Sequence, residues 1–254
     1  MQYFFYLALS IYLTVHSQVE LSRRASEASL RCTKGEMSKF YSLWSGAEFS
    51  YNVSFVRPRA EAGDAAAQYN LGYLYEDGLC VKQDYAQAAV WYLKAAKQGY
   101  ALAGEKLGSL YKGGRGVNQD YEEAAKWFQM SAEGGYGLAQ WELGGAYSSG
   151  RGVPKDDIAS LKWLRRAANQ GFIPAQIELG YIYARGLSVK QDYLEAYFWH
   201  SVAAKSDSQY WRLSKKAAMR LSPEEIVAVN ERVNAWDITP AELKRDENEP
   251  AGAE

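Results

Sequence analysis

The chain has 254 residues, with 29 Lys and Arg against 30 Asp and Glu and a formal net charge of −1. This balance, without a block of like charge, argues against a nucleic-acid partner, because nucleic-acid binding usually requires a basic stripe. Only two histidines and two cysteines are present, and no Cys/His cluster has the spacing of a metal site. We therefore expect no cofactor, no metal and no catalytic residues.

The chain begins with an apolar stretch of 13 residues, 3–15. A membrane-spanning helix needs about 20 residues, whereas this length suits the core of a signal peptide. Val15 and Ser17 supply small residues at positions −3 and −1 of a cleavage site, so we expect residues 1–17 to be a signal peptide and the chain to be exported, either periplasmic or secreted. The stretch lacks a preceding Lys or Arg, which leaves an uncleaved anchor or another start codon as alternatives. The chain would then be cytoplasmic or membrane-anchored, with membrane contact only through this segment.

Residues 18–47 have no clear periodicity and are expected to be irregular. Residues 48–62 align with the second half of the repeat described next, so we expect a degenerate half-repeat that caps the array. Cys32 and Cys80 could pair in an exported protein, or both could remain free thiols.

A Leu-Gly pair recurs every 36 residues, at Leu71, Leu107, Leu143 and Leu179, and a fixed period of this length indicates a solenoid. Four other residue types keep the same phase. They are the tyrosines Tyr75, Tyr111, Tyr147 and Tyr183, the glycines Gly78, Gly114, Gly150 and Gly186, the aspartates Asp84, Asp120, Asp156 and Asp192, and the tryptophans Trp91, Trp127, Trp163 and Trp199.

Each repeat predicts two helices. The Leu and Tyr positions form one apolar stripe, and Gly in that stripe would let a neighbouring helix approach closely. The aspartate would cap the second helix, with Gln87, Glu123 or Glu195 completing a capping box in three copies. His200, which follows Trp199, is expected to be a packed, partly buried residue.

These residues resemble the Sel-1-like repeat family, which is related to the tetratricopeptide repeats and includes bacterial exported proteins. The family pattern is met most fully at 67–99 and 103–135 and covers roughly residues 63–207. The resemblance implies an all-α, right-handed α-solenoid of stacked antiparallel helix hairpins. We place the four repeats at 63–98, 99–134, 135–170 and 171–207.

Beyond the repeats, residues 208–237 predict C-terminal capping helices. Ser222 would be the N-cap of the last one, followed by Pro223 at its first position and Glu225 at its third. Residues 238–254 form a charged, apolar-poor tail that we expect to be disordered.

The resemblance implies a non-catalytic scaffold or adaptor that binds a partner protein or peptide on the concave face of the array, and no small-molecule substrate is expected. The alternatives are an enzyme that binds or hydrolyses β-lactams and a glycan-binding envelope protein. By analogy with tetratricopeptide repeats, the candidate face carries residues that vary between copies. They are Tyr69, Tyr73 and Glu76; Glu105, Ser109 and Lys112; Trp141 and Ser148; and Ile177, Tyr181 and Arg185.

Overall fold

The computed structural model describes residues 40–41, 48–49 and 53–236. The predicted signal peptide, most of the segment 18–47 and the predicted tail lie outside these residues. The described chain divides into two compact units. Unit 1 contains the described residues up to Ala103 together with Gly114–Asn118, and unit 2 contains Gly104–Gly113 and the described residues from Gln119 onward.

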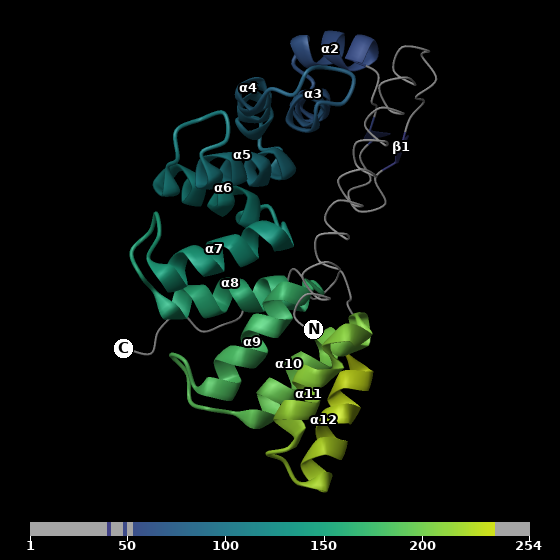
Figure 1. The fold of residues 1–254 in the computed structure, drawn as a ribbon, viewed down its shortest axis with the longest axis vertical. Coiled ribbons are helices and arrows are strands. Elements are labelled where there is room, and N and C mark those ends of the chain that lie inside the picture. Colours follow the sequence, from purple (N-terminus) through teal and green to yellow (C-terminus); the bar gives the residue numbers. More distant parts are fainter. Residues whose placement is uncertain (1–39, 42–47, 50–52, 237–254) are drawn as a thin grey trace, which may run out of the picture. The chain divides into compact units, whose positions relative to one another are not determined.

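The described fold is all-α apart from one pair of two-residue strands, as predicted (Figure 1). Strand β1 (Phe40–Tyr41) pairs antiparallel with β2 (Glu48–Phe49), so the half-repeat predicted at 48–62 has its helix only from Val53. The first helices are α2 (Val53–Glu61), α3 (Ala65–Asp77), α4 (Tyr85–Ala96) and α5 (Ala101–Gly113). They are followed by α6 (Tyr121–Glu133), α7 (Gly137–Ser149), α8 (Asp157–Asn169), α9 (Ile173–Arg185), α10 (Tyr193–Ser206), η1 (Ser208–Tyr210), α11 (Trp211–Ala218) and α12 (Pro223–Ala235).

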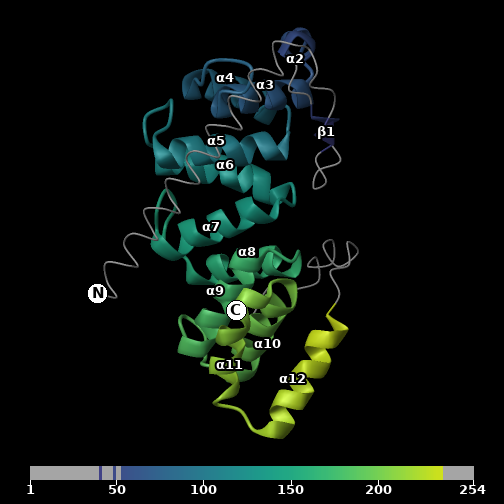
Figure 2. The same ribbon diagram turned by 45° about the vertical axis from the view of Figure 1, so that its right-hand side comes forward.

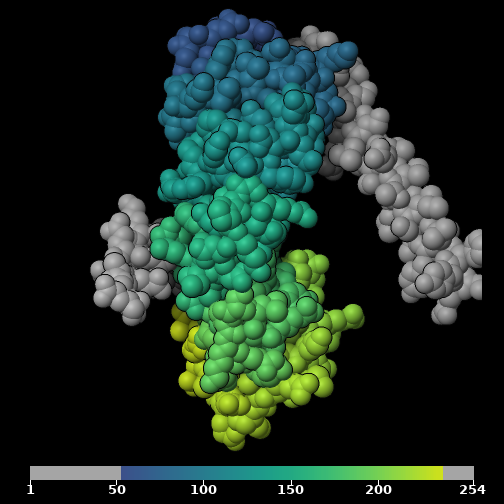
Figure 3. Space-filling view, turned by 90° about the vertical axis from the view of Figure 1, so that its left-hand side faces the viewer, coloured from purple at the N-terminus to yellow at the C-terminus, as the bar shows by residue number. Residues whose placement is uncertain are grey.

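Helices that follow one another in sequence pack against one another within each unit. In unit 1, α3 lies against both α2 and α4, and in unit 2 each helix from α6 to α10 lies against the next. The colours of unit 2 in the space-filling view accordingly run from teal to yellow in sequence order (Figure 3). Each hairpin therefore buries its apolar face against its neighbours, as a repeat architecture requires.

The repeated aspartate begins each second helix as predicted. Asp84 accepts a hydrogen bond from the backbone N–H of Gln87, and Asp120 and Asp192 accept from the corresponding Glu123 and Glu195. The predicted reciprocal half of the capping box is replaced in two copies by ion pairs. The carboxylate of Glu123 binds Lys126, and that of Glu195 binds Arg232.

The glycine of each Leu-Gly pair receives a side chain from the second helix of its own repeat. A Cβ on Gly72 would lie 2.7 Å from the ring of Tyr92, and a Cβ on Gly144 would lie 2.9 Å from Cγ of Leu164. The same position in the fourth repeat is met by His200, which is 3 % exposed and therefore packed, as predicted. Glycine is kept here because any side chain would push the two helices of a hairpin apart.

The loop between the two helices of each repeat contains a residue with positive φ. At Gly152, whose φ is +77°, a Cβ would lie 1.9 Å from the carbonyl oxygen of Tyr121, so only glycine fits there. The first and last repeats carry Cys80 and Ser188 at this position, with φ of 61° and 59°. Ser188 donates to the carboxylate of Asp157 at 2.6 Å, and Cys80 is disulfide-bonded, which excludes the free-thiol alternative for this residue.

The C-terminal helices close unit 2. Helices α11 and α12 both pack on α10 (Figure 2). The predicted start of α12 is confirmed, because Ser222 and Glu225 form a complete capping box with Pro223 at the first turn. Val229 and Val233 of α12 join a buried cluster with Trp199 and Val202 of α10, so this helix covers the end of the repeat core.

Candidate functional site

The candidate face of unit 1 is largely occupied by internal contacts. Tyr69 is 9 % exposed and packs its ring against Tyr92 and Tyr100, with centroids 5.7 and 5.3 Å apart. Glu76 is also buried and accepts a 2.6 Å hydrogen bond from the hydroxyl of Tyr92. Only Tyr73 of the three predicted residues is partly exposed. Tyr69 and Glu76 therefore contribute to packing within the hairpin, and their side chains offer little surface to a partner.

The candidate residues on α5 of unit 2 divide into a buried and an exposed group. Glu105 is 4 % exposed and accepts a hydrogen bond from Ser109 at 3.0 Å, so its carboxylate is also inaccessible to a partner. Lys112 lies one helical turn beyond Ser109 and is exposed. Its ammonium group lies 2.9 and 2.6 Å from the two carboxylate oxygens of Glu142.

The candidates on α9 form a smaller exposed group. Tyr181 is 40 % exposed, packs edge-on against His200, and carries the guanidinium of Arg185 6.0 Å from its ring centroid. Ile177 is partly buried. Ser148 on α7 is exposed, and its hydroxyl donates to the carbonyl of Gly145 at 3.1 Å.

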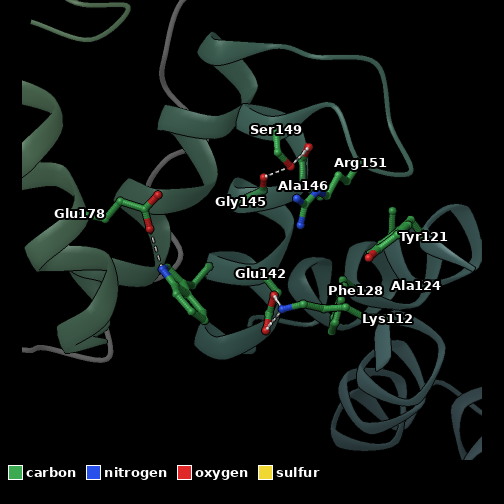
Figure 4. A pocket seen from close by; sticks show the side chains of 12 residues that line it. Lys112, Tyr121, Ala124, Phe128, Glu142, Gly145, Ala146, Ser149, Arg151 and Glu178 are labelled. Carbon is green, nitrogen blue, oxygen red and sulfur yellow. Dashed lines mark hydrogen bonds and ion pairs between the residues drawn. The ribbon is translucent and has the colours of Figure 1, made fainter. Parts of the chain in front are cut away.

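A pocket of about 370 Å³ in unit 2 is lined in part by two of the predicted residues (Figure 4). It includes Lys112 and Trp141 from the predicted set, but neither Ser109 nor Ser148. Its other lining residues are Tyr121, Ala124, Ala125, Phe128, Glu142, Gly145, Ala146, Ser149, Arg151 and Glu178. These come from α5, α6, α7 and α9 and from the loop after α7, so three consecutive hairpins contribute to one hollow.

One face of α7 forms the floor of this pocket. Trp141, Gly145 and Ser149 are spaced four residues apart, which places them in one row along the helix. A Cβ on Gly145 would find no atom within 4 Å, in contrast to the adjacent Gly144. Gly in a helix interior costs about 1 kcal/mol relative to Ala. Packing explains this cost at Gly144 but not at Gly145, where the missing side chain only keeps the pocket open.

The pocket combines an apolar wall with charged groups at its rim. Phe128, Ala124 and Ala146 supply apolar surface, and Trp141 is held by a 2.7 Å hydrogen bond from its indole N–H to Glu178 and by ring contact with Phe172. Burial raises the pKa of the Glu178 carboxyl, and the hydrogen bond from Trp141 partly opposes this shift.

The cations at the rim differ in their partners. Lys112 is neutralised by Glu142, whereas Arg151 stacks over the Tyr121 ring at 5.8 Å and forms no ion pair with a described residue. Figure 4 shows Glu178 and Tyr121 on opposite sides of the hollow. The arrangement offers one guanidinium and one partly buried carboxyl group to a ligand, around an apolar centre.

The described residues form neither a metal site nor a membrane-spanning helix. They contain no group of three or more His, Cys, Asp or Glu side chains placed to hold a metal ion. Within the same residues, no helix has the length and apolar character needed to cross a membrane. The pocket lining includes the aromatic residues Tyr121 and Trp141, and Tyr and Trp are the kinds of residue favoured at binding hot spots.

The fold defines a protein of stacked helix hairpins, and comparison with known proteins specifies the class. The Sel1 repeat family model matches residues 65–100, 103–136, 137–172 and 173–208. The chain belongs to the Sel1 repeat family, whose members are generally protein-interaction scaffolds and typically non-catalytic. No curated protein matches the sequence.

Two solved structures are similar over most of the chain. A Sel1 repeat protein from Oxalobacter formigenes is 29% identical with a TM-score of 0.62, and the match covers 73% of this chain and 79% of that one. The protein c5321, a protective antigen present in uropathogenic Escherichia coli strains and displaying an SLR fold, is 28% identical with a TM-score of 0.69. That match covers 94% of this chain but only 52% of c5321, so the chain spans about half of that protein.

Sequence reasoning missed Gly145, Glu142 and Glu178. Gly145 occupies the position held by Tyr73, Ser109 and Tyr181 in the other repeats, and it has no side chain that would mark it as a binding residue. The signal was nevertheless present in the sequence, since Gly145 follows the packing glycine Gly144 and no other repeat has a glycine at its position. Glu142 and Glu178 each directly precede the Leu of a Leu-Gly pair, and only their partners in space, Lys112 and Trp141, reveal their role.

Proposed function

We propose that this chain is a non-catalytic scaffold that binds an extended segment of a partner protein along the first helices of unit 2. The pocket around Gly145 would receive one large partner side chain. Its volume of about 370 Å³ lies near the low end of the range of about 300–1,000 Å³ typical of ligand pockets, which suits a single anchor residue. The observation that carries the proposal is the open space above Gly145.

The chemistry of the rim supports a peptide as the occupant. An apolar or aromatic anchor would contact Phe128 and Trp141, while Arg151 could bind a carboxylate or carbonyl on the partner's backbone or side chain. The exposed pair Tyr181 and Arg185 lies on α9, the same helix as Glu178, and extends the polar and aromatic surface beyond the pocket. A central anchor surrounded by polar contacts is the usual anatomy of a protein-binding hot spot.

The proposal is tested in two steps: a peptide ligand is first selected, and the pocket is then filled by a substitution. Peptides that bind the wild-type chain are selected from a displayed random library and their affinity is measured by isothermal titration calorimetry. An added Cβ at Gly145 would have no atom within 4 Å, so Gly145→Leu should extend into the open space and strongly weaken peptide binding, and circular dichroism checks that the variant is folded. Ile158→Ala is the matched control, because Ile158 is highly exposed on α8 and does not line the pocket.

Gly145→Leu is a sharper test than replacement of Trp141. The Trp141 ring also packs on Phe172, and its indole N–H donates a hydrogen bond to Glu178. Removal of the ring would therefore lower the stability of the fold as well as change the pocket. Selected peptides that bind Gly145→Leu as tightly as wild type would show that the pocket is not the binding site.

We also propose that the protein is exported. The apolar stretch 3–15 suits a signal peptide, and the disulfide at Cys80 suits an oxidising compartment. Expression of the full chain followed by N-terminal sequencing of the product tests this directly. A mature chain that begins at Gln18 supports export, and a cytosolic chain that retains Met1 contradicts it.

A further inference from the structure

The exposed face of α11 and the turn that follows it are rich in basic residues. Residues 208–223 contain Arg212, Lys215, Lys216 and Arg220 and no Asp or Glu. The chain as a whole is almost neutral, with a net charge of −1. Four positive charges are therefore concentrated on one short helix and the turn that follows it.

The guanidinium of Arg220 lies 5.9 Å from the ring of Tyr193 on α10, whereas the other three cations lie on the side of α11 that faces away from α10. Leu213, Ala217 and Leu221 are buried or partly buried, which fixes the inner side of α11 toward α10. The four cationic residues are exposed, and none of them forms an ion pair with a described residue. The carboxylate of Asp207, the acid that precedes them, accepts hydrogen bonds from the backbone N–H and the side-chain amide of Gln209.

Two large apolar side chains lie among the cations. Trp211 is 50 % exposed and Met219 is 79 % exposed. Trp211, Lys215 and Met219 are spaced four residues apart and so form one row on the outer face. The ammonium of Lys215 and the guanidinium of Arg212 lie 5.5 and 5.7 Å from the Trp211 ring.

We propose that this face of α11 binds the surface of a lipid bilayer that contains anionic lipids. Basic side chains near such a surface are attracted by its negative potential, and Trp is favoured at the depth of the headgroups because its ring is apolar and its N–H is polar. Long Lys and Arg side chains can keep their charges among the headgroup phosphates while Trp211 and Met219 insert more deeply. The contact lies on a helix that does not line the pocket, so it would leave the scaffold's peptide site accessible.

The distribution of charge favours a bilayer over an acidic protein. A protein partner would need carboxylates positioned opposite four exposed cations around the exposed Trp211 ring. A fluid layer of anionic headgroups can place negative charges next to all four cations, because its lipids are not held in a fixed geometry. Membrane contact through α11 would also be independent of residues 3–15, which sequence reasoning treated as the sole membrane-contacting segment.

The experiment is co-sedimentation of the full chain with vesicles of phosphatidylcholine alone or with about a third phosphatidylglycerol, at low and high salt. We expect binding only to the anionic vesicles and its loss at high salt, since exposed charges are screened beyond about 10 Å at 0.1 M salt. The double variant Lys215→Gln/Lys216→Gln should weaken partitioning about thirty-fold, because each basic residue near the surface contributes about 1 kcal/mol. Trp211→Ala should weaken it as well.

The control variant removes two charges elsewhere. Lys82→Gln/Lys190→Gln changes two exposed lysines in inter-helix loops and should bind like wild type. Any binding through residues 3–15 would persist in all variants and on neutral vesicles, so it would not be mistaken for the effect of α11. Equal binding by the α11 variant and wild type would overturn the proposal. A second result would also overturn it: no binding to the vesicles, but binding to poly-L-glutamate that Lys215→Gln/Lys216→Gln abolishes. That result would identify an acidic protein as the partner.

Discussion

The adjacent residues Gly144 and Gly145 of α7 test directly whether one glycine is required for packing while the other only leaves the pocket open. Both lie in the interior of the same helix, Gly137–Ser149, and both are replaced by alanine in separate variants. Because both lie in the interior of the same helix, the gain in helix propensity when glycine is replaced by alanine should be the same at both positions. Any difference in stability between the variants therefore reports what surrounds each Cβ.

The structure gives opposite expectations for the two sites. At Gly145 nothing lies within 4 Å of an added Cβ, so only the propensity gain of about 1 kcal/mol remains. At Gly144 the Cβ would lie 2.9 Å from Cγ of Leu164 and 3.3 Å from the carbonyl oxygen of Ser160. Overpacking of this kind costs about 1–3 kcal/mol, which cancels or exceeds the propensity gain.

The assay is thermal unfolding followed by circular dichroism, with calorimetry as a second probe. For a chain of this size 1 kcal/mol corresponds to roughly 2–4 °C, so Gly145→Ala should raise Tm by about that amount. Gly144→Ala should leave Tm unchanged or lower it by up to about twice as much. A Tm for Gly145→Ala below that of wild type, or equal stabilisation by both variants, would refute the argument that Gly145 has no packing role.

Three further expectations follow from other parts of the structure. Gly152→Ala should lower the free energy of unfolding, measured by chemical denaturation, by at least about 2 kcal/mol, because a left-handed backbone costs about 1–2 kcal/mol and the new Cβ would clash with Tyr121. Gly135 also has a positive φ but no atom within 4 Å of an added Cβ, so Gly135→Ala should show only the cost of the left-handed backbone. Burial lowers the pKa of His200, so its contribution to stability is complete above pH 6.5 and is lost as pH falls from 6.5 through the lowered pKa of the folded state; His200→Leu should lessen the decline in Tm between pH 7 and pH 5, and an unchanged pH profile would contradict this. Mass spectrometry of the unreduced protein should find no free thiol at Cys80, and alkylation of that residue before reduction would contradict the disulfide.

The period of 36 residues predicts most of the fold because its recurring residues have local physical roles. Aspartate begins a helix by accepting backbone hydrogen bonds, and this holds at Asp84, Asp120, Asp156 and Asp192. Similarly, Ser222, Pro223 and Glu225 locate the start of α12 from sequence alone. Capping and turn signals of this kind depend on a few neighbouring residues and need no knowledge of distant contacts.

The candidate site was less predictable because periodicity shows which positions vary but not which way their side chains point. Tyr69 and Glu105 vary between copies as a binding face would, yet both are buried. Their contacts with Tyr100 and Ser109 become visible only in three dimensions. Conversely, Gly145 forms the centre of the pocket through the absence of a side chain, which a search for interacting residues overlooks.

The pairing of Glu178 with Trp141 illustrates the same limit. The two residues are 37 positions apart, and their 2.7 Å hydrogen bond links the first helices of consecutive repeats. The two side chains can form this hydrogen bond only because α7 and α9 place them next to each other in space. Sequence reasoning can nominate Trp141 as a hot spot, but the carboxyl group that orients its ring must be found in the structure.

The central claim is that a partner peptide occupies the space above Gly145. The most direct measurement is the Kd of one selected peptide for wild type, Gly145→Ala and Gly145→Leu, with circular dichroism confirming that each variant is folded. We predict a graded loss, with Gly145→Leu binding at least about ten-fold more weakly, which corresponds to about 1.4 kcal/mol. Equal affinity of the peptide for all three folded proteins would contradict the account.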